Sequence, residues 1–248
     1  MKVFKRIYDS GKAPLVDDEL FNATKDNLFG ALEKGYSLNG TVVDGETLIG
    51  LQKNLVVFSL FKNHHNMRDV ASLLTIDGKK IAYADFEKEA LKVSISYNKN
   101  WLKTEYDTTV STAESASKWV DIQKSKSIYS LLQYVTKHDD KVRHEHANFN
   151  GTILPVNHPY WNTHFPPNGW NCRCTVEKLK PVYPDGTAVP ITAKPNEETY
   201  QSQFNFNAGK TKQIFGENHT YFKNVNDDTI KQLNEYAETV SLKRSKWW

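Results

Sequence analysis

The residue types best suited to metal or acid–base chemistry gather in one stretch, residues 136–176. It holds both cysteines of the chain and five of its eight histidines, namely His138, His144, His146, His158 and His164. One residue separates Cys172 from Cys174, so on an extended strand both thiols project from the same face. His144 and His146 repeat this spacing. Thiolate and imidazole groups are preferred zinc ligands, usually four in a tetrahedron, so the stretch predicts a candidate zinc site.

The same residues also have an interpretation without a metal. The histidine spacing is irregular, and Cys-x-Cys is a less specific signal than the Cys-x-x-Cys of zinc knuckles. Reduced core cysteines beside hydrogen-bonded histidines of a polar loop explain the composition equally well. A disulfide between Cys172 and Cys174 is disfavoured, because so short a spacing strains the bond. The sequence therefore requires no cofactor and leaves zinc as a hypothesis.

Catalysis has less support in these residues. Asp139, Asp140, His144, Glu145 and His146 offer the acid, base and ligands of a metal-dependent hydrolase, and a cysteine–histidine nucleophile pair is equally easy to draw. Neither arrangement has a signature spacing, and the sequence contains no phosphate-binding glycine-rich loop and no HExxH. The pattern favours a structural loop and not an enzyme. In this interpretation an ion pair of Arg143 with Asp139 or Asp140 fixes the shape of the loop.

Around this stretch the sequence predicts an α+β fold, with N-terminal helices followed by a small antiparallel sheet that carries a Pro/Trp/Cys-rich loop. Apolar residues recur at helical spacing from residue 20 to a C-terminal cap at Gly35, and again over residues 46–62. His64–His65 is then expected as a solvated pair at a helix end. Residues 83–124 lack Pro and Gly and predict a long helix of roughly 60 Å, with a break near residues 98–100.

After residue 127 the pattern changes to that of strands, predicted within residues 128–136, 151–156 and 172–179. An extended arm, strand and turn pieces over residues 204–222, and a helix over 227–240 are expected to follow. We therefore divide the chain into an N-terminal helical region (1–80), a core (81–180) and a C-terminal arm with a terminal helix packed on that core (181–248).

Composition narrows the class of protein. The chain has 248 residues, of which 39% are hydrophobic, and a net charge of only +3. No apolar run is long enough for a transmembrane helix, and the N-terminus has no signal-peptide core, so we expect a cytoplasmic protein without a membrane partner. The weak net charge argues against bulk binding of nucleic acid.

Two motifs are more specific than composition. The pattern D-x-x-V-R-x-x-H-A-x-x-x-G is followed by P-P-N-G-W-N-C-R-C. Its residues are Asp139, Val142, Arg143, His146, Ala147, Gly151, Pro166, Pro167, Asn168, Gly169, Trp170, Asn171, Cys172, Arg173 and Cys174. Upstream, N-x-x-W-L-x-T-E-Y includes Trp101 and Glu105. Over roughly residues 58–179 these motifs resemble the phage Mu F-like minor head proteins, also called head morphogenesis proteins.

The resemblance implies a minor structural protein of a tailed bacteriophage or prophage. Such proteins act at the portal or capsid interior during procapsid assembly, and some are thought to accompany DNA into the host. The implied partners are portal, capsid and scaffold proteins and, for ejected members, DNA. The implied location is the head interior or procapsid, within the host cytoplasm during assembly.

The resemblance also bears on the metal. Some relatives carry Cys-x-x-Cys where this chain has Arg143 and His146, which implies a metal site that has lost one ligand here. His146, Cys172 and Cys174 with either His144 or His158 would restore four ligands. The competing hypothesis is a metal-dependent nuclease or a toxin-delivery module that uses the His/Cys cluster, since Mu F-like domains also occur fused to toxin modules.

Overall fold

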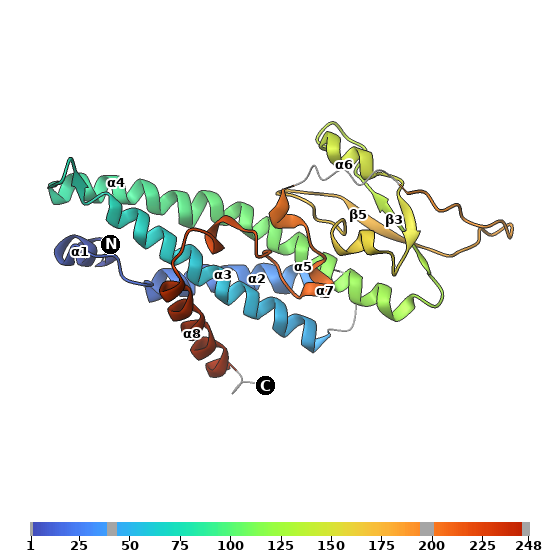
Figure 1. Cartoon of the computed structure of the whole chain (residues 1–248), viewed down its shortest axis with the longest axis horizontal. Helices are drawn as coiled ribbons and strands as arrows, with labels where there is room; N and C mark the ends of the chain where they lie inside the picture. Colours follow the sequence, from blue (N-terminus) through green and yellow to red (C-terminus); the bar gives the residue numbers. More distant parts are fainter. Residues whose placement is uncertain (1, 39–43, 194–200, 245–248) are drawn as a thin grey trace. The chain divides into compact units, whose positions relative to one another are not determined.

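The computed structural model describes residues 2–38, 44–193 and 201–244, and it confirms an α+β fold with helices before a small antiparallel sheet (Figure 1). Backbone contacts divide the chain into two compact units that interleave along the sequence. The helical unit comprises Met1–Gly30, Lys53–Tyr106 and His219–Trp248, and the sheet unit comprises Ala31–Gln52 and Asp107–Asn218. No helix among the described residues combines the length and apolarity needed to cross a membrane.

The longer helices form readily because they contain apolar stripes and no proline. They are α1 (Lys2–Ser10), α2 (Asp18–Ser37), α3 (Gly45–Ser72), α4 (Tyr83–Ile95), α5 (Leu102–Ser125) and α8 (Asp227–Arg244). A short hairpin of β1 (Thr75–Ile76) and β2 (Lys79–Lys80) turns through Asp77 and Gly78, both with positive φ. One core cluster of the helical unit joins α1, α3 and α4 through Val3, Phe4, Ile7, Met67, Val70, Leu74, Phe86 and Ala90.

Two predicted helix ends are wrong. Helix α3 continues through His64–His65, because the imidazole of His65 is buried and bonds to the carbonyl of Tyr221 at 2.9 Å instead of meeting water. Gly35 lies inside α2 and not at its end. A Cβ at that position would lie 2.1 Å from the carbonyl oxygen of Val110, so the glycine permits a close approach of two backbones.

The long helix is modified where a break is predicted. A π-helical segment, Ser96–Trp101, connects α4 to α5 without interrupting the helical path. Such an insertion widens one turn and shifts the faces of the helix on either side of it. Tyr97 is therefore buried, with its hydroxyl donating to Asp69 at 2.6 Å, while Trp101 stays 46% exposed against the Tyr97 ring.

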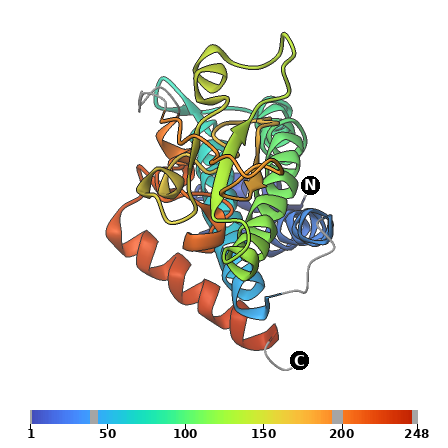
Figure 2. The same cartoon turned by 90° about the vertical axis from the view of Figure 1, so that its right-hand side faces the viewer.

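The sheet unit contains the three predicted strands in the order β4-β3-β5. The central strand β3 (Leu131–Val135) pairs antiparallel with β4 (Ile153–Pro155) on one side and with β5 (Thr175–Leu179) on the other. Helix α5 runs along this sheet (Figure 2), and Trp119 and Ile122 contribute to the core beneath it. Tyr134, Phe149, Trp161, Phe165 and Val176 are further members of that core.

Elsewhere the structure has short helices where the sequence predicts loops or strands. Unpredicted pieces are α6 (His144–Phe149) and the 3-10 turn η2 (Pro159–Asn162). Strand pieces expected over residues 204–222 are wrong, because the structure has η3 (Ser202–Phe204), α7 (Ala208–Thr211) and η4 (Thr220–Phe222) there. In α7 the Asn207 side chain accepts hydrogen bonds from the next backbone amides and so starts a helix.

Candidate functional site

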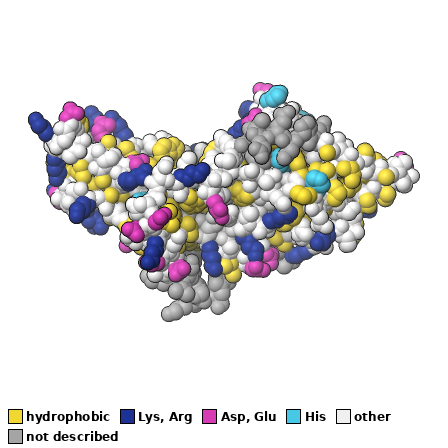
Figure 3. Space-filling view, in the orientation of Figure 1, with side chains coloured by type: hydrophobic (Ala, Val, Ile, Leu, Met, Phe, Trp, Pro, Cys, Tyr) yellow, Lys and Arg dark blue, Asp and Glu magenta, His cyan; other side chains and the backbone are white. Residues whose placement is uncertain are grey.

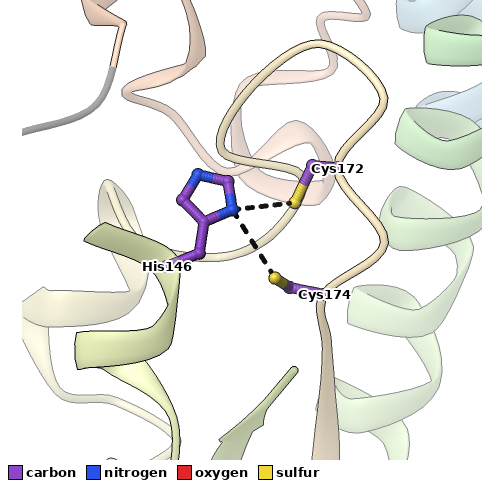
Figure 4. Close-up of side chains that lie close together, drawn as sticks. All are labelled: His146, Cys172 and Cys174. Atoms are coloured by element: carbon purple, nitrogen blue, oxygen red, sulfur yellow. Dashed lines mark hydrogen bonds between the residues drawn. The ribbon is translucent and has the colours of Figure 1, made fainter. Parts of the chain in front are cut away.

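Three side chains with metal-binding groups converge in the sheet unit: His146, Cys172 and Cys174 (Figure 4). The Sγ atoms of the two cysteines each lie 3.6 Å from Nδ1 of His146. All three potential ligand atoms lie within 4.8 Å of one another, and His146 and Cys172 are buried. Among the described residues, this is the one group of three or more histidine, cysteine or carboxylate side chains that lie close enough together to share a metal ion.

Local backbone geometry explains why these residues meet. His146 lies on the buried side of α6, where its ring stacks on Phe149. The strand prediction places both cysteines on a strand, but in the structure they precede β5. Asn171 has a φ of 55°, and the amide of Cys172 donates to the carbonyl of Gly169 at 3.1 Å. This turn, and not strand alternation, directs both thiols toward the imidazole.

The geometry fits a zinc ion. For zinc–sulfur and zinc–nitrogen bonds of about 2.3 and 2.0–2.1 Å, two ligands at the tetrahedral angle lie about 3.6 Å apart. Both sulfur–nitrogen separations in the cluster have this value. The donor chemistry, one imidazole and two thiols, is also that of zinc sites. The cluster could thus supply three corners of a zinc tetrahedron.

The two thiols share their protons unequally. A hydrogen bond from Cys174, helped by His146, lowers the pKa of Cys172 well below that of an ordinary thiol. The pKa of Cys174 is raised, first by its hydrogen bond to Cys172 and then by burial. The first deprotonation of the pair is therefore favoured and the second opposed, because a second thiolate would meet the charge of the first.

Arg143 lies beside this cluster but does not form the predicted ion pair. Its Nη2 donates to the carbonyl of Trp170, and its guanidinium would lie 3.1 Å from a Cβ placed on Gly169. Asp139 instead pairs with Arg173 in a bidentate contact at 2.6 and 2.7 Å. That exposed pair lowers the pKa of Asp139. The expected ion pair of Arg143 with Asp139 or Asp140 is therefore wrong, since Asp139 binds Arg173 and Arg143 binds a backbone carbonyl.

The remaining histidines of the stretch lie outside the cluster. His144 is exposed, because residues two apart on a helix face nearly opposite directions. His158 is also exposed, and its Nδ1 accepts the amide of Tyr160 at 3.2 Å, which caps η2. His164 is buried, stacks on the Tyr160 ring at 4.1 Å, and has a pKa lowered to about 4 by burial.

Other motif residues shape the wall around the cluster. The Pro166–Pro167 peptide bond is cis, and the Pro166 carbonyl accepts a hydrogen bond from Ser115 of α5. The Trp170 ring packs against Phe204 at 5.1 Å. Gly151, with a φ of 78°, turns the chain into β4. These contacts give the motif a packing role around the three ligands.

Trp101 and Glu105 belong to the helical unit, where a buried polar network lies. Glu105 accepts a hydrogen bond from Lys62 at 2.5 Å and another from the hydroxyl of Tyr221 at 3.2 Å. Both charged side chains are almost completely buried. Burial, which opposes the charged form, raises the pKa of Glu105 and lowers that of Lys62. In the sequence, Lys62 follows Leu55 and Phe58 on one apolar helix face, and this position was the available signal of a buried lysine.

Two residues next to the thiols, Tyr134 and Asn168, were given no role at the site from the sequence. The hydroxyl of Tyr134 donates to Oδ1 of Asn168 at 3.0 Å, and Asn168 in turn donates to the carbonyl of Thr163 at 3.2 Å. Burial, followed by the charge of Cys172, raises the pKa of Tyr134 well above its usual value. Tyr134 therefore remains a neutral hydrogen-bond donor. Its inward position on β3 was the available signal.

A cavity of about 410 Å³ lies against the cysteines. One wall is a face of α5 that includes Ser111, Ser115 and Lys118, and the opposite wall includes Pro167, Cys172 and Cys174, among other residues. Cys174 is only partly buried, so this side of the cluster is open to small solutes.

Comparison with known proteins identifies relatives for the part of the chain that carries the cluster. Residues 81–177 match a family model described as "Phage Mu protein F like protein". The chain is 34% identical over 102 residues to "Putative capsid assembly protein F" of Escherichia phage Mu, which covers 41% of this chain and 23% of that protein. It is 29% identical over 96 residues to "Mu-like prophage FluMu F protein" of Haemophilus influenzae, covering 39% of this chain and 23% of that protein.

The match covers less than a quarter of either relative. No solved structure gives a significant match to the chain. The family segment extends from α4 to β5 and includes all three residues of the candidate metal site.

Proposed function

We propose that this chain, a Mu F-like protein over residues 81–177, is a head-assembly protein of a tailed bacteriophage or prophage that works by presenting surfaces and not by turnover. The observation that carries the proposal is the family segment itself, which spans the sheet, α5 and the His/Cys cluster. The name of the phage Mu relative, a capsid assembly protein, supports the same role.

In finer detail, we propose that the chain joins the procapsid at the portal or on the capsid interior. Its partners there are portal, capsid and scaffold proteins. Its net charge of +3 is too small for a bulk DNA-packaging role, so any contact with DNA is local. Under this proposal the protein is in the host cytoplasm during assembly and in the head afterwards.

The assembly role is tested by co-expression with the portal, scaffold and major capsid proteins of the same phage. Procapsids are purified on a gradient and probed for the chain. We expect it to sediment with procapsids at low copy number and to remain after a salt wash. A chain that stays at the top of the gradient in the presence of complete procapsids contradicts the proposal.

We further propose that His146, Cys172 and Cys174 hold a zinc ion that fastens α6 to the segment before β5. The sulfur–nitrogen separations and the donor types support this assignment. When bound, zinc would supply a cross-link between parts of the chain that lie 26 and 28 residues apart.

Elemental analysis provides a matched test of this site. We expect about one zinc per chain in the wild type and in His144→Ala, and much less in His146→Ala, because only the second substitution removes a converging ligand. Equal zinc in the two variants, or none in the wild type after expression with added zinc, contradicts the assignment.

A metal-dependent nuclease is the second candidate function. The observation in its favour is the cavity beside the thiols, since catalytic zinc sites combine three protein ligands with one open position. Incubation of the chain with DNA and divalent metals, beside His146→Ala, tests it. Identical DNA products from both proteins end this candidate and leave the assembly role untouched.

A further inference from the structure

Residues 180–193 form a hairpin arm that leaves the sheet after β5 (Figure 1). A bridge pairs Val182 with Ala188, and the amide of Tyr183 donates to the carbonyl of Thr187 at 2.8 Å. The turn is closed by Asp185, whose Oδ1 accepts both the amide and the hydroxyl of Thr187 at 2.9 and 2.7 Å. These bonds give the arm a defined conformation.

The base of the arm is fixed to the sheet. Val189 is buried with Leu131 and Ile153, and Leu179 packs against this cluster. Where the arm returns, Thr192 and Ile153 exchange two backbone hydrogen bonds of 2.9 Å each. An element held at its base and closed at its tip loses little conformational entropy when it binds a partner.

The surface of this arm is apolar and exposed. Val182, Tyr183 and Ile191 are 48%, 44% and 60% exposed, and they belong to the most exposed large apolar side chains among the described residues. Further exposed apolar side chains of the arm include those of Pro181, Pro184, Ala188 and Pro190. In Figure 3 yellow side chains gather at the right-hand end, where Figure 1 places the arm. Contiguous exposed apolar surface of this kind marks interaction sites.

Charge and backbone chemistry restrict the partner. A quarter of the whole chain is charged, but the arm contains only Lys180 and Asp185, and the latter is engaged in the turn. An arm with so little positive charge is unsuited to nucleic acid or to an anionic membrane. Its three prolines lack amide donors, which disfavours the addition of a strand from a partner. The remaining mode is insertion of apolar side chains into a groove of another protein.

A second copy of this chain is a poor fit for that groove. Two arms in mutual contact would offer about seven side chains each, well below the roughly 20–30 residues per side of a stable interface. Three cavities formed by described residues, of about 580, 500 and 410 Å³, each contain at least three charged side chains in their lining. An arm with so little charge is better matched by a groove on a different protein.

We propose that the arm of residues 180–193 is a docking element that inserts into an apolar groove of a head subunit other than this chain. The choice of a head subunit rests on the proposed assembly function. Tyr183, which Pro184 follows, is the central anchor, because a tyrosine buries a large area with little loss of side-chain freedom.

The test uses the full chain and three substitutions of exposed apolar residues. Tyr183→Ser with Ile191→Ser removes apolar area from the arm, and Ile128→Ser removes it from an exposed position elsewhere in the sheet unit. Each protein is co-expressed with the portal, scaffold and major capsid proteins of the same phage, and procapsids are quantified for the chain. We expect the arm variant to be incorporated at least ~10-fold less than wild type, and Ile128→Ser to match wild type.

A photo-crosslinking residue at position 183, in place of Tyr183, identifies the occupant of the groove. Crosslinks to a portal, scaffold or capsid subunit support the inference, and crosslinks only to second copies of the chain overturn it. Equal incorporation of wild type and arm variant also overturns it while the assembly function stands. If the wild type itself is not incorporated, both proposals fail. Circular dichroism and urea midpoints equal to wild type show that the variants are folded.

Discussion

Removal of one buried histidine is predicted to change how stability responds to acid. His219 is 4% exposed, and its ring packs against Phe58 with 5.0 Å between centroids. Its Nδ1 accepts the amide of Tyr221 at 3.2 Å and so caps η4. Burial, followed by the charges of Lys62 and His65, lowers the pKa of His219 to about 3.

The sign follows from the difference between the folded and unfolded states. In the unfolded chain a histidine has a pKa of about 6.5, so below that pH the unfolded state takes up a proton that the folded state refuses. Stability is therefore fully present above pH 6.5 and is lost as pH falls toward 3. Each pH unit within this window is worth about 1.4 kcal/mol, so His219 accounts for a loss of about 2 kcal/mol at pH 5.

His219→Asn tests this reasoning, because asparagine keeps a capping acceptor and removes the titrating group. The free energy of unfolding is measured in urea at pH 8 and pH 5. We expect the wild type to lose about 2 kcal/mol more than His219→Asn between these pH values. His158→Asn is the matched control, since His158 caps η2 by the same bond but is exposed. If wild type and His219→Asn lose equal stability, the buried histidine is not the cause.

Three further substitutions test other parts of the structure. Glu105→Gln leaves Lys62 buried without its countercharge and should cost roughly 3–5 kcal/mol in urea unfolding, and a cost near zero refutes the buried pair. Gly35→Ala should destabilise the folded protein by about 1–3 kcal/mol. Gly30→Ala on the same helix, with open space around it, should be neutral or stabilising. Equal effects of the two substitutions contradict the close approach of Gly35 to the Val110 backbone. Arg143→Cys adds a third thiol and should retain zinc against a chelator better than Arg143→Ala, and equal retention argues against a tetrahedral site there.

The sequence correctly predicted the helices and strands that are determined by the spacing of nearby residues. Three strands and the long helix followed from spacing, but in place of the break predicted near residues 98–100 the π-helical segment Ser96–Trp101 continues the helix. Features with distant causes were missed. Polar His64–His65 looked like a helix end, because the partner that satisfies His65 is Tyr221, 156 residues away. Gly35 looked like a cap for the same reason, since Val110 is what requires a glycine there.

The candidate site shows the same division. The two cysteines and a histidine were found by residue type, but the choice of His146 over His144 depends on α6, whose six residues carry too little periodicity to predict. Arg143 was expected to pair with Asp139 or Asp140 because they are close in sequence, whereas in the structure Asp139 pairs with Arg173, 34 residues away. One signal was available and unused: Asn-His-x-Tyr occurs at residues 157–160 and 218–221, and both histidines cap 3-10 turns.

The position of the His/Cys cluster explains why a cross-link would matter there. Between His146 and the cysteines the chain contains the end of α6, β4, one 3-10 turn and irregular loop, so most of this segment lies outside regular helices and strands. A link that closes a loop of 26 to 28 residues restricts the unfolded chain by about 3.5 kcal/mol on the loop-entropy estimate used for disulfides. That amount is a large share of the stability of a typical domain. Zinc at His146, Cys172 and Cys174 would thus stabilise the sheet from which the apolar arm projects, and loss of zinc should reduce procapsid incorporation through the arm without any change in the arm itself.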